Sequence, residues 1–174
     1  MDDLTGPRAP RTLAAASGCG LALLAGTVIV CATGAWAEQG AGPAPIRSRA
    51  DGRCLDADLG HIGSNGTRIQ LWACNGWANQ AWTYDPVAHT IRSLVNGRCL
   101  DADEGNLHRN GTRVQLWDCN GHANQQWVYD QRTRAISNLA AHRCLDADLK
   151  GVGSNGARIH LWDCNRWNNQ KWRL

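Results

Sequence analysis

The chain has no phenylalanine and only two tyrosines, yet it has nine tryptophans among its 174 residues. It also lacks any block of like charge, because 18 basic and 15 acidic residues are spread along it for a net charge of +3. Nothing in this charge pattern indicates a nucleic acid or an anionic membrane as a partner. The 19 glycines follow no regular period. The sequence therefore predicts neither a nucleic-acid-binding protein nor a collagen-like one.

The first 37 residues differ in composition from the rest. Two arginines precede a small-apolar run over residues 13–35, which ends in an A-x-A cleavage signal at residues 35–37. We predict a secretory signal peptide, residues 1–37, and a secreted, extracellular protein. An uncleaved membrane anchor is the alternative, since the apolar run is long enough to span a bilayer. Residues 38–45 are rich in glycine, proline and alanine and are predicted to be a linker.

From residue 46 onward, one block of sequence occurs three times. Cys54, Cys99 and Cys144 are spaced 45 residues apart, and no insertion separates the copies. Such a period indicates one supersecondary unit repeated, in which each copy buries its apolar face against its neighbours. We place the repeats at about residues 46–88, 89–133 and 134–174.

The six cysteines that follow the leader suit an exported, disulfide-bonded domain. Six cysteines allow about fifteen pairings. Pairing within each repeat closes the shortest loops and respects the threefold repetition. There is no C-x-x-C pair and no cysteine–histidine cluster at ligand spacing, so no metal site is predicted, and no cofactor. The predicted disulfides are Cys54–Cys74, Cys99–Cys119 and Cys144–Cys164.

Apolar and polar residues alternate as they do in half-buried strands. In the segment RIQLW at 68–72, Ile69 and Leu71 share one face while Gln70 and Trp72 share the other. The same alternation occurs in the other two repeats. Asn-Gly pairs before these segments favour turns with positive φ. The pattern predicts an all-β domain of about four short strands per repeat, or about twelve in total.

Three C-L-D segments and three Q-x-W triplets complete the pattern, the triplets at residues 80–82, 125–127 and 170–172. With the predicted disulfides, this pattern resembles the ricin-type lectin domain, also called carbohydrate-binding module family thirteen, over about residues 46–174. The resemblance implies a β-trefoil, a six-stranded barrel capped by three hairpins. It also implies binding of galactose-type sugars, or of xylan-type chains as in secreted bacterial enzymes. The tryptophans of the triplets, Trp82, Trp127 and Trp172, are predicted to lie in the core.

Strand alternation places Asp56, Gln70 and Trp72 together on the face opposite the core. Apolar surface rimmed by polar groups is typical of a binding site. An indole face can stack on the C–H face of a pyranose. Carboxylates and amides can bond to its hydroxyls. The resemblance implies a carbohydrate site in each repeat: Asp56, Gln70, Trp72, Asn79 and Gln80; Asp101, Gln115, Trp117, Asn124 and Gln125; and Asp146, His160, Trp162, Asn169 and Gln170, where His160 replaces the glutamine of the other repeats.

The sequence leaves structural alternatives open for these residues. Asp56 could brace a turn, Trp72 could belong to the core if the register shifted by one, and Gln80 could serve both roles. Three further side chains could either form walls of the sites or pack within the fold: Trp77, His122 and Trp167.

Catalysis is not predicted. Asp56 and Asp58 are two carboxylates, as glycoside hydrolysis requires, but all three repeats carry the pair, and no Ser-His-Asp or Cys-His arrangement stands out. Asp58 and its equivalents, Asp103 and Asp148, are instead predicted to form hydrogen bonds at strand ends and turns.

A trefoil protease inhibitor is the alternative from another class. Such an inhibitor relies on one reactive loop and would not need the same Asp, Trp and Asn in every repeat. A carbohydrate-targeting subunit of a separate secreted glycoside hydrolase or toxin is a further alternative. The sequence favours a secreted, non-catalytic, multivalent lectin, expected to be a monomer, whose partner is a galactoside or a plant-type polysaccharide.

Overall fold

The computed structural model describes residues 42–174, and every structural statement here concerns that part of the chain. The predicted signal peptide and most of the predicted linker lie outside it. Thirteen short strands and five three-residue 3-10 helices are formed. No helix in this part of the chain is long and apolar enough to cross a membrane. In chain order the elements are β1 (Ala44–Pro45), β2 (Arg47–Ser48), β3 (Cys54–Ala57), η1 (Leu59–His61), β4 (Thr67–Trp72), η2 (Ala78–Gln80), β5 (Ala81–Asp85), β6 (Thr90–Ser93), β7 (Cys99–Ala102), η3 (Glu104–Asn106), β8 (Thr112–Trp117), η4 (Ala123–Gln125), β9 (Trp127–Asp130), β10 (Ala135–Asn138), β11 (Arg143–Ala147), β12 (Ala157–Trp162), η5 (Asn168–Gln170) and β13 (Trp172–Arg173).

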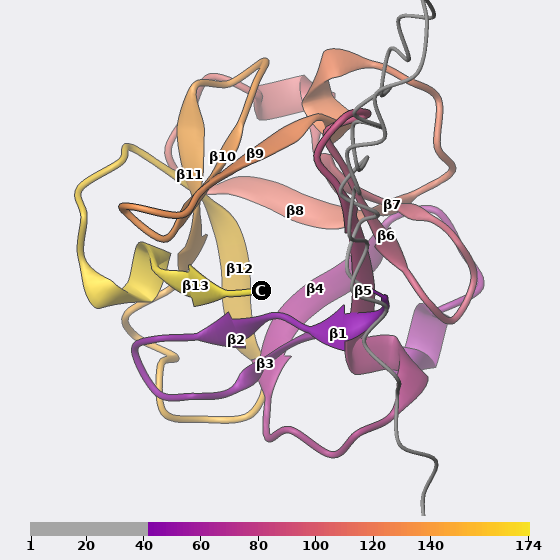
Figure 1. Ribbon diagram of the computed structural model, residues 1–174, viewed down its shortest axis with the longest axis horizontal. Coiled ribbons are helices and arrows are strands. Elements are labelled where there is room, and N and C mark those ends of the chain that lie inside the picture. The colour runs from indigo at the N-terminus through magenta and orange to yellow at the C-terminus, as the bar shows by residue number, and fades with distance from the viewer. Residues whose placement is uncertain (1–41) are drawn as a thin grey trace, which may run out of the picture. The chain divides into compact units, whose positions relative to one another are not determined.

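The three long strands β4, β8 and β12 form the centre of the fold. Each pairs with the other two, so that they close into a ring (Figure 1). Each is also the second strand of a hairpin, with β3, β7 and β11 as the first strands. Because equivalent strands come from successive repeats, the 45-residue period of the sequence becomes a pseudo-threefold β-trefoil.

Outer strand pairs cap this arrangement. Two of them are ordinary hairpins, β5–β6 and β9–β10. The third consists of β2 and β13, which come from opposite ends of the described chain, with Arg173 opposite Arg47 (Figure 1). Strand pairing also begins before the predicted body. Ala44 and Pro45, predicted to be linker, form β1 and pair with β5, since Ala44 lies opposite Trp82.

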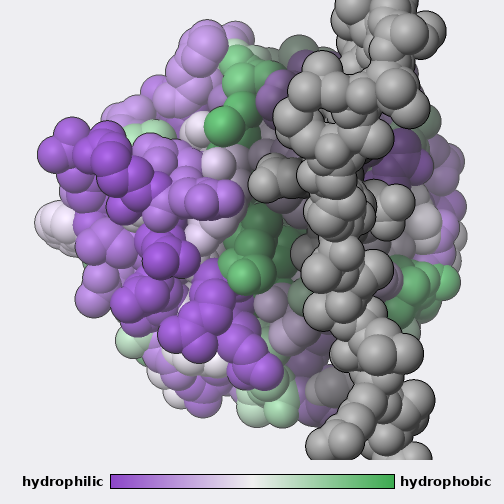
Figure 2. All heavy atoms as spheres, in the orientation of Figure 1, coloured by the Kyte–Doolittle hydropathy of each residue, from purple (hydrophilic) through white to green (hydrophobic). Residues whose placement is uncertain are grey.

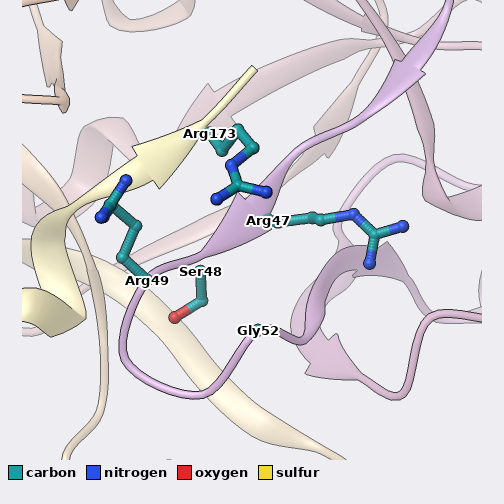
Figure 3. A pocket seen from close by; sticks show the side chains of 5 residues that line it. All are labelled: Arg47, Ser48, Arg49, Gly52 and Arg173. Carbon is teal, nitrogen blue, oxygen red and sulfur yellow. The ribbon is translucent and has the colours of Figure 1, made fainter.

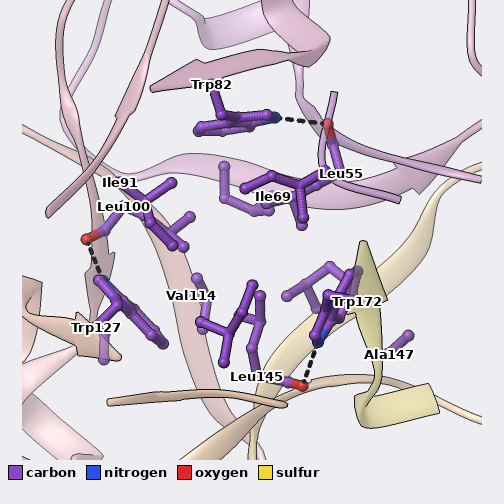
Figure 4. Packing of buried hydrophobic residues seen from close by; sticks show 14 of the residues in the cluster. Leu55, Ile69, Trp82, Ile91, Leu100, Val114, Trp127, Leu145, Ala147 and Trp172 are labelled. Atoms are coloured by element: carbon purple, nitrogen blue, oxygen red, sulfur yellow. Dashed lines mark hydrogen bonds between the residues drawn. The ribbon is translucent and has the colours of Figure 1, made fainter. Parts of the chain in front are cut away.

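The core is built from the apolar face that the alternation predicts. Ile69 and Leu71 are buried, as are their equivalents in the other repeats. Trp82, Trp127 and Trp172 are at most 2% exposed and lie in the same cluster. Each indole N–H donates to a backbone carbonyl at 2.9–3.0 Å, as a buried tryptophan requires (Figure 4). The acceptors are Leu55, Leu100 and Leu145.

Disulfides and turns fix the outer loops of each repeat. The structure has the three disulfides predicted from the sequence, Cys54–Cys74, Cys99–Cys119 and Cys144–Cys164. Asp58 and its two equivalents accept hydrogen bonds from backbone N–H groups two residues later, at 2.9–3.0 Å. This is the turn-bonding role predicted for them. Gly66 of the first Asn-Gly turn has a φ of +86°, a conformation that glycine adopts without strain.

Candidate functional site

Three amide side chains converge on one carboxylate in the first repeat. Asp56 on β3 lies opposite Gln70 on β4 in the strand register. The Gln70 Nε2 donates to Asp56 Oδ1 at 3.1 Å. From the 3-10 helix η2, Asn79 Nδ2 and Gln80 Nε2 donate to Asp56 Oδ2 at 2.8 and 2.9 Å. Two strands and a short helix thus hold the carboxylate in one orientation.

The second repeat reproduces this cluster around Asp101. Its three donors come from the equivalent positions on β8 and η4. They are Gln115, Asn124 and Gln125, at 3.0, 2.9 and 2.9 Å.

The third repeat keeps the cluster although His160 replaces the glutamine. His160 Nε2 lies 3.0 Å from Asp146 Oδ1, the distance at which the glutamines bond in the other repeats. Asn169 and Gln170 donate to Asp146 Oδ2 at 2.9 and 2.7 Å. The His160 ring also lies 5.4 Å from the Trp162 ring, centroid to centroid. The substitution therefore preserves the bond to the carboxylate.

Burial dominates the electrostatics of the first two carboxylates. Asp56 is 3% exposed, and this desolvation raises the pKa of its carboxyl above the usual 3.8. The amide hydrogen bonds act in the opposite direction, because they favour the ionised form. The pKa of Asp101 is raised for the same reason. An ionised carboxylate accepts about four hydrogen bonds. Three positions are used by the amides, so Oδ1 retains capacity for a further donor.

Gln80 forms hydrogen bonds only with other protein groups of the cluster and its neighbouring loop. Its Nε2 also donates to the Ala73 carbonyl at 3.1 Å, and its Oε1 accepts from the Asn75 backbone N–H at 2.9 Å. All its polar atoms are therefore bonded to protein, so that Gln80 positions Asp56 and has no free group for a ligand. Gln125 and Gln170 make the equivalent bonds.

Unlike these glutamines, the asparagines each have one polar side-chain atom without a hydrogen-bond partner among the described residues. Asn79 Nδ2 bonds to Asp56 and also to the Ala57 carbonyl at 3.0 Å. Its Oδ1, although buried, has no hydrogen-bond partner among the described residues, and the same holds for Asn124 and Asn169. This amide oxygen is the one acceptor of the asparagine side chain that no protein group satisfies.

An exposed tryptophan lies at the end of the long strand in each repeat. Trp72, Trp117 and Trp162 are 38–41% exposed, as the predicted register requires. In the second repeat, Trp117 lines a hollow of about 470 Å³ together with Asp101, Gln115 and Asn124. In the third, a hollow of about 320 Å³ is lined by Asp146, His160, Trp162 and Asn169. Four of the five residues expected for each of these two sites thus line one surface, and the Q-x-W glutamine lies behind it.

The walls of the hollows include residues that the sequence left undecided. Trp77 and Trp167 are about 60% exposed, and Trp167 lines the third hollow. In the second hollow His122 takes this place, with its Nδ1 3.2 Å from Glu104 Oε1. The three side chains therefore wall the sites or stand exposed, and none belongs to the core.

Several lining residues were missed from the sequence: Glu104, Arg113, Leu149, Lys150 and two asparagines. Asn120 and Asn165 line the second and third hollows, and each accepts from the backbone N–H two residues later at 2.9 Å. The signal for them was the same asparagine at residue 75, identical in all three repeats.

A neighbouring repeat completes the second hollow. Asn65 and Gly66, from the Asn-Gly turn of the first repeat, line it. Asn65 Oδ1 accepts from the Asp118 backbone N–H at 2.8 Å, and its Nδ2 donates to Asp118 Oδ2 at 3.0 Å. The turn that the sequence predicted is thus also a contact between repeats.

These features define a β-trefoil with a carboxylate–amide–tryptophan cluster in each repeat. Residues 42–173 match the family described as the ricin-type β-trefoil lectin domain, and the chain belongs to this family. A search of curated proteins found no match.

Solved structures with the same fold include both isolated domains and parts of enzymes. The designed threefold-symmetric protein ThreeFoil aligns at 23% identity and a TM-score of 0.69, over 76% of this chain and 97% of its own. The C-half of an earthworm R-type lectin, solved in complex with GalNAc, aligns at 26% identity and a TM-score of 0.60. The alignment covers 76% of this chain and 97% of the lectin chain. An exo-β-1,3-galactanase from Clostridium thermocellum aligns at 23% identity and a TM-score of 0.65. The alignment covers 78% of this chain but only 30% of the enzyme.

Proposed function

We propose that the protein is a multivalent lectin that binds one sugar in each repeat and releases it unchanged. The observation that carries this proposal is the threefold recurrence of a buried carboxylate held by amides beside an exposed tryptophan. The cluster lies apart from the apolar core, which is formed by the opposite faces of the same strands. Its repetition suits a chain that presents several equal sites to one target.

The chemistry of the cluster suits a pyranose. The C–H face of the ring stacks on the indole of Trp72. Hydroxyls at the ring edge donate to the remaining acceptor position of Asp56 Oδ1, and charge-assisted hydrogen bonds are the strong ones. The amides of Gln70, Asn79 and Gln80 fix the carboxylate before the ligand arrives, which lowers the ordering cost of binding.

We infer a galactose-type ligand, or a xylan- or arabinan-type chain. The earthworm lectin C-half bound to GalNAc supports the galactose class. A carboxylate, an aromatic face and an amide would also accept pentose chains, so that both classes belong in the test. Secretion is part of this proposal and is supported by the leader pattern and by the three disulfides. The proposal also includes a monomeric state and a galactoside or plant-type target.

Catalysis by this chain is not part of the proposal, and the second aspartate of each repeat has a turn-bonding role. Glycoside hydrolysis needs a second carboxyl across the scissile bond. Asp58, the nearest candidate, accepts the Gly60 N–H and caps η1. A carbohydrate-targeting role beside a separate catalytic protein is the second candidate, favoured by the galactanase of which this fold forms about a third. A protease inhibitor would leave the three clusters without a role.

A glycan array with matched variants tests the proposal. The triple variant Trp72→Ala/Trp117→Ala/Trp162→Ala should fold normally and lose binding to every glycan that the unaltered chain retains. The control Trp72→Phe/Trp117→Phe/Trp162→Phe keeps an aromatic face and should retain most of the binding. If the alanine variant bound the same glycans as strongly, the three clusters would not be the sites.

A further inference from the structure

Three arginines gather where the two ends of the described chain pair. Arg47 and Arg49 come from β2 and the residue after it, and Arg173 comes from β13. With Ser48 and Gly52 they line a pocket of about 190 Å³ (Figure 3). The face of the molecule that carries β2 and β13 is largely hydrophilic, with apolar residues only in small separate groups (Figure 2).

Two of these arginines lie on paired strands, and their guanidinium groups point in different directions (Figure 3). Arg47 lies directly opposite Arg173 in the antiparallel register. Directly opposed side chains have Cβ atoms roughly 4.5–5.5 Å apart, and like charges in this position destabilise a sheet. Arg47 is also half-buried, which strengthens the repulsion because less water screens it.

No carboxylate of residues 42–174 forms an ion pair with any of the three. Asp51, the acidic side chain nearest to Arg47 and Arg49 in the sequence, bonds elsewhere, to Arg53 and to the Gly153 N–H. Arg47 donates through Nη1 to the sulfur of Cys74, which leaves its other N–H groups available. The protein thus holds three positive charges around one pocket without neutralising them.

The threefold repeat supplies an internal comparison. The equivalent cross-strand pairs are Thr83 with Arg92 and Ser137 with Val128. The positions equivalent to Arg49 are leucines, Leu94 and Leu139. The trefoil therefore forms these caps without three arginines, so the cluster at β2 and β13 is not a requirement of the fold.

We propose that Arg47, Arg49 and Arg173 bind an oxyanion carried on an acidic glycan, either a uronate carboxylate or a sulfate ester. Planar guanidinium groups form paired, charge-assisted hydrogen bonds with both kinds of group. An anion in the pocket also removes the repulsion between Arg47 and Arg173. The site is separate from the three carboxylate–tryptophan clusters, and the choice of a glycan as carrier rests on the proposed lectin function.

Affinity electrophoresis of the full chain tests this proposal. Gels would contain a polygalacturonate, a sulfated galactan or an uncharged galactan. The triple variant Arg47→Gln/Arg49→Gln/Arg173→Gln should bind an acidic polymer about tenfold or more weakly than the unaltered chain. Its binding to the uncharged polymer should not change. Binding to the acidic polymers should weaken as salt increases, and the uronate and sulfate arms show which group is preferred.

Two matched controls make the result specific. Arg92→Gln removes an arginine at the position equivalent to Arg47 and should leave binding to acidic polymers unchanged. Trp72→Ala/Trp117→Ala/Trp162→Ala should lose the uncharged polymer yet keep salt-sensitive binding to the acidic ones, which separates this proposal from the lectin function. The proposal is overturned if no acidic polymer retards the unaltered chain at low salt, or if the triple arginine variant is retarded equally. Binding to anionic lipid vesicles without binding to either acidic polymer would also overturn it.

Discussion

Trp72 and Trp82 are close in the chain but have opposite environments. Trp82 is 2% exposed and its N–H bonds to the Leu55 carbonyl, whereas Trp72 is 39% exposed. Trp82→Ala should lower the free energy of unfolding by about 3–5 kcal/mol, as truncation of a buried aromatic does. Trp72→Ala should leave it nearly unchanged and weaken sugar binding. Chemical denaturation and calorimetry of the two variants would check this, and equal losses of stability would contradict the assigned roles.

The raised pKa values of Asp56 and Asp101 predict a particular response to acid. A carboxyl whose pKa is raised by folding contributes stability below its usual pKa of 3.8, and this contribution is lost as pH rises through the raised value. Acidification therefore does not destabilise the fold through these two groups. Sugar binding needs the ionised acceptor. As the pH is lowered, the affinity of the first two sites should therefore fall with a midpoint above pH 3.8, while the fold persists.

Sugar titrations and thermal unfolding, measured in parallel between about pH 3 and 7, separate the two effects. Loss of binding that only accompanies unfolding would show that the carboxylates do not act as acceptors. A matched control is Trp72→Phe, which leaves Asp56 and its pKa in place and should show the same pH midpoint.

For single side chains, the sequence predicted which face of a strand they occupy better than which groups they bond. Alternation correctly placed Ile69 and Leu71 inward and Trp72 outward. It could not show that Gln70 is also buried, because Gln70 lies beside Arg158 and the Gly156 turn of the third repeat, which only the fold brings near. Nor could it show that every polar side-chain atom of Gln80 is hydrogen-bonded to protein, because its partner Asn75 is brought near only by the fold.

Strands of four or more residues were readable in the sequence, and the shorter elements were not. The strand β4 has a clear two-residue period and an Asn-Gly turn before it. The 3-10 helices η1 and η2 have three residues each, too few to show a period, yet η2 carries Asn79 and Gln80 to Asp56. The site was therefore predicted through the family resemblance, while its geometry depended on elements without a sequence signal.

The disulfide loops allow a prediction at this scale. Replacing both Cys54 and Cys74 by alanine should lower the free energy of unfolding by about 3 kcal/mol, because an open loop of this length gains chain entropy in the unfolded state. Denaturation of the double variant gives the value. Peptide mapping without reductant should recover Cys54 linked to Cys74, and a link from Cys54 to Cys119 would contradict the structure.

The trefoil formed by residues 42–174 closes by pairing β2 with β13, and no local sequence pattern contains this closure. Arg47 and Arg173 are far apart in sequence, so the chain has no basic block, yet β2 and β13 bring them opposite each other. The same closure makes each repeat depend on the next. Asn65 of the first repeat, for example, bonds to Asp118 of the second.

Whole-molecule binding should depend on the number of sites. One open site with one indole and a few hydrogen bonds suggests a dissociation constant on the order of 0.1–1 mM for a monosaccharide. A polysaccharide that reaches two sites should gain avidity of about 10²–10⁴. Trp72→Ala alone should therefore weaken polysaccharide retention in part, and a second substitution, Trp117→Ala, should cost far more. Equal loss from one and from two substitutions would contradict this avidity.

If each repeat is a working sugar site, the stoichiometry of monosaccharide binding should show it. Tryptophan variants suit this measurement because Asp56 is buried under three amide donors, which its removal would leave unpaired. Calorimetry should give a stoichiometry near three for the unaltered chain, since His160 keeps the bond to Asp146 in the third site. Each of Trp72→Ala, Trp117→Ala and Trp162→Ala should lower it by about one. A stoichiometry of one, abolished by a single substitution, would show instead that two repeats serve only as scaffold.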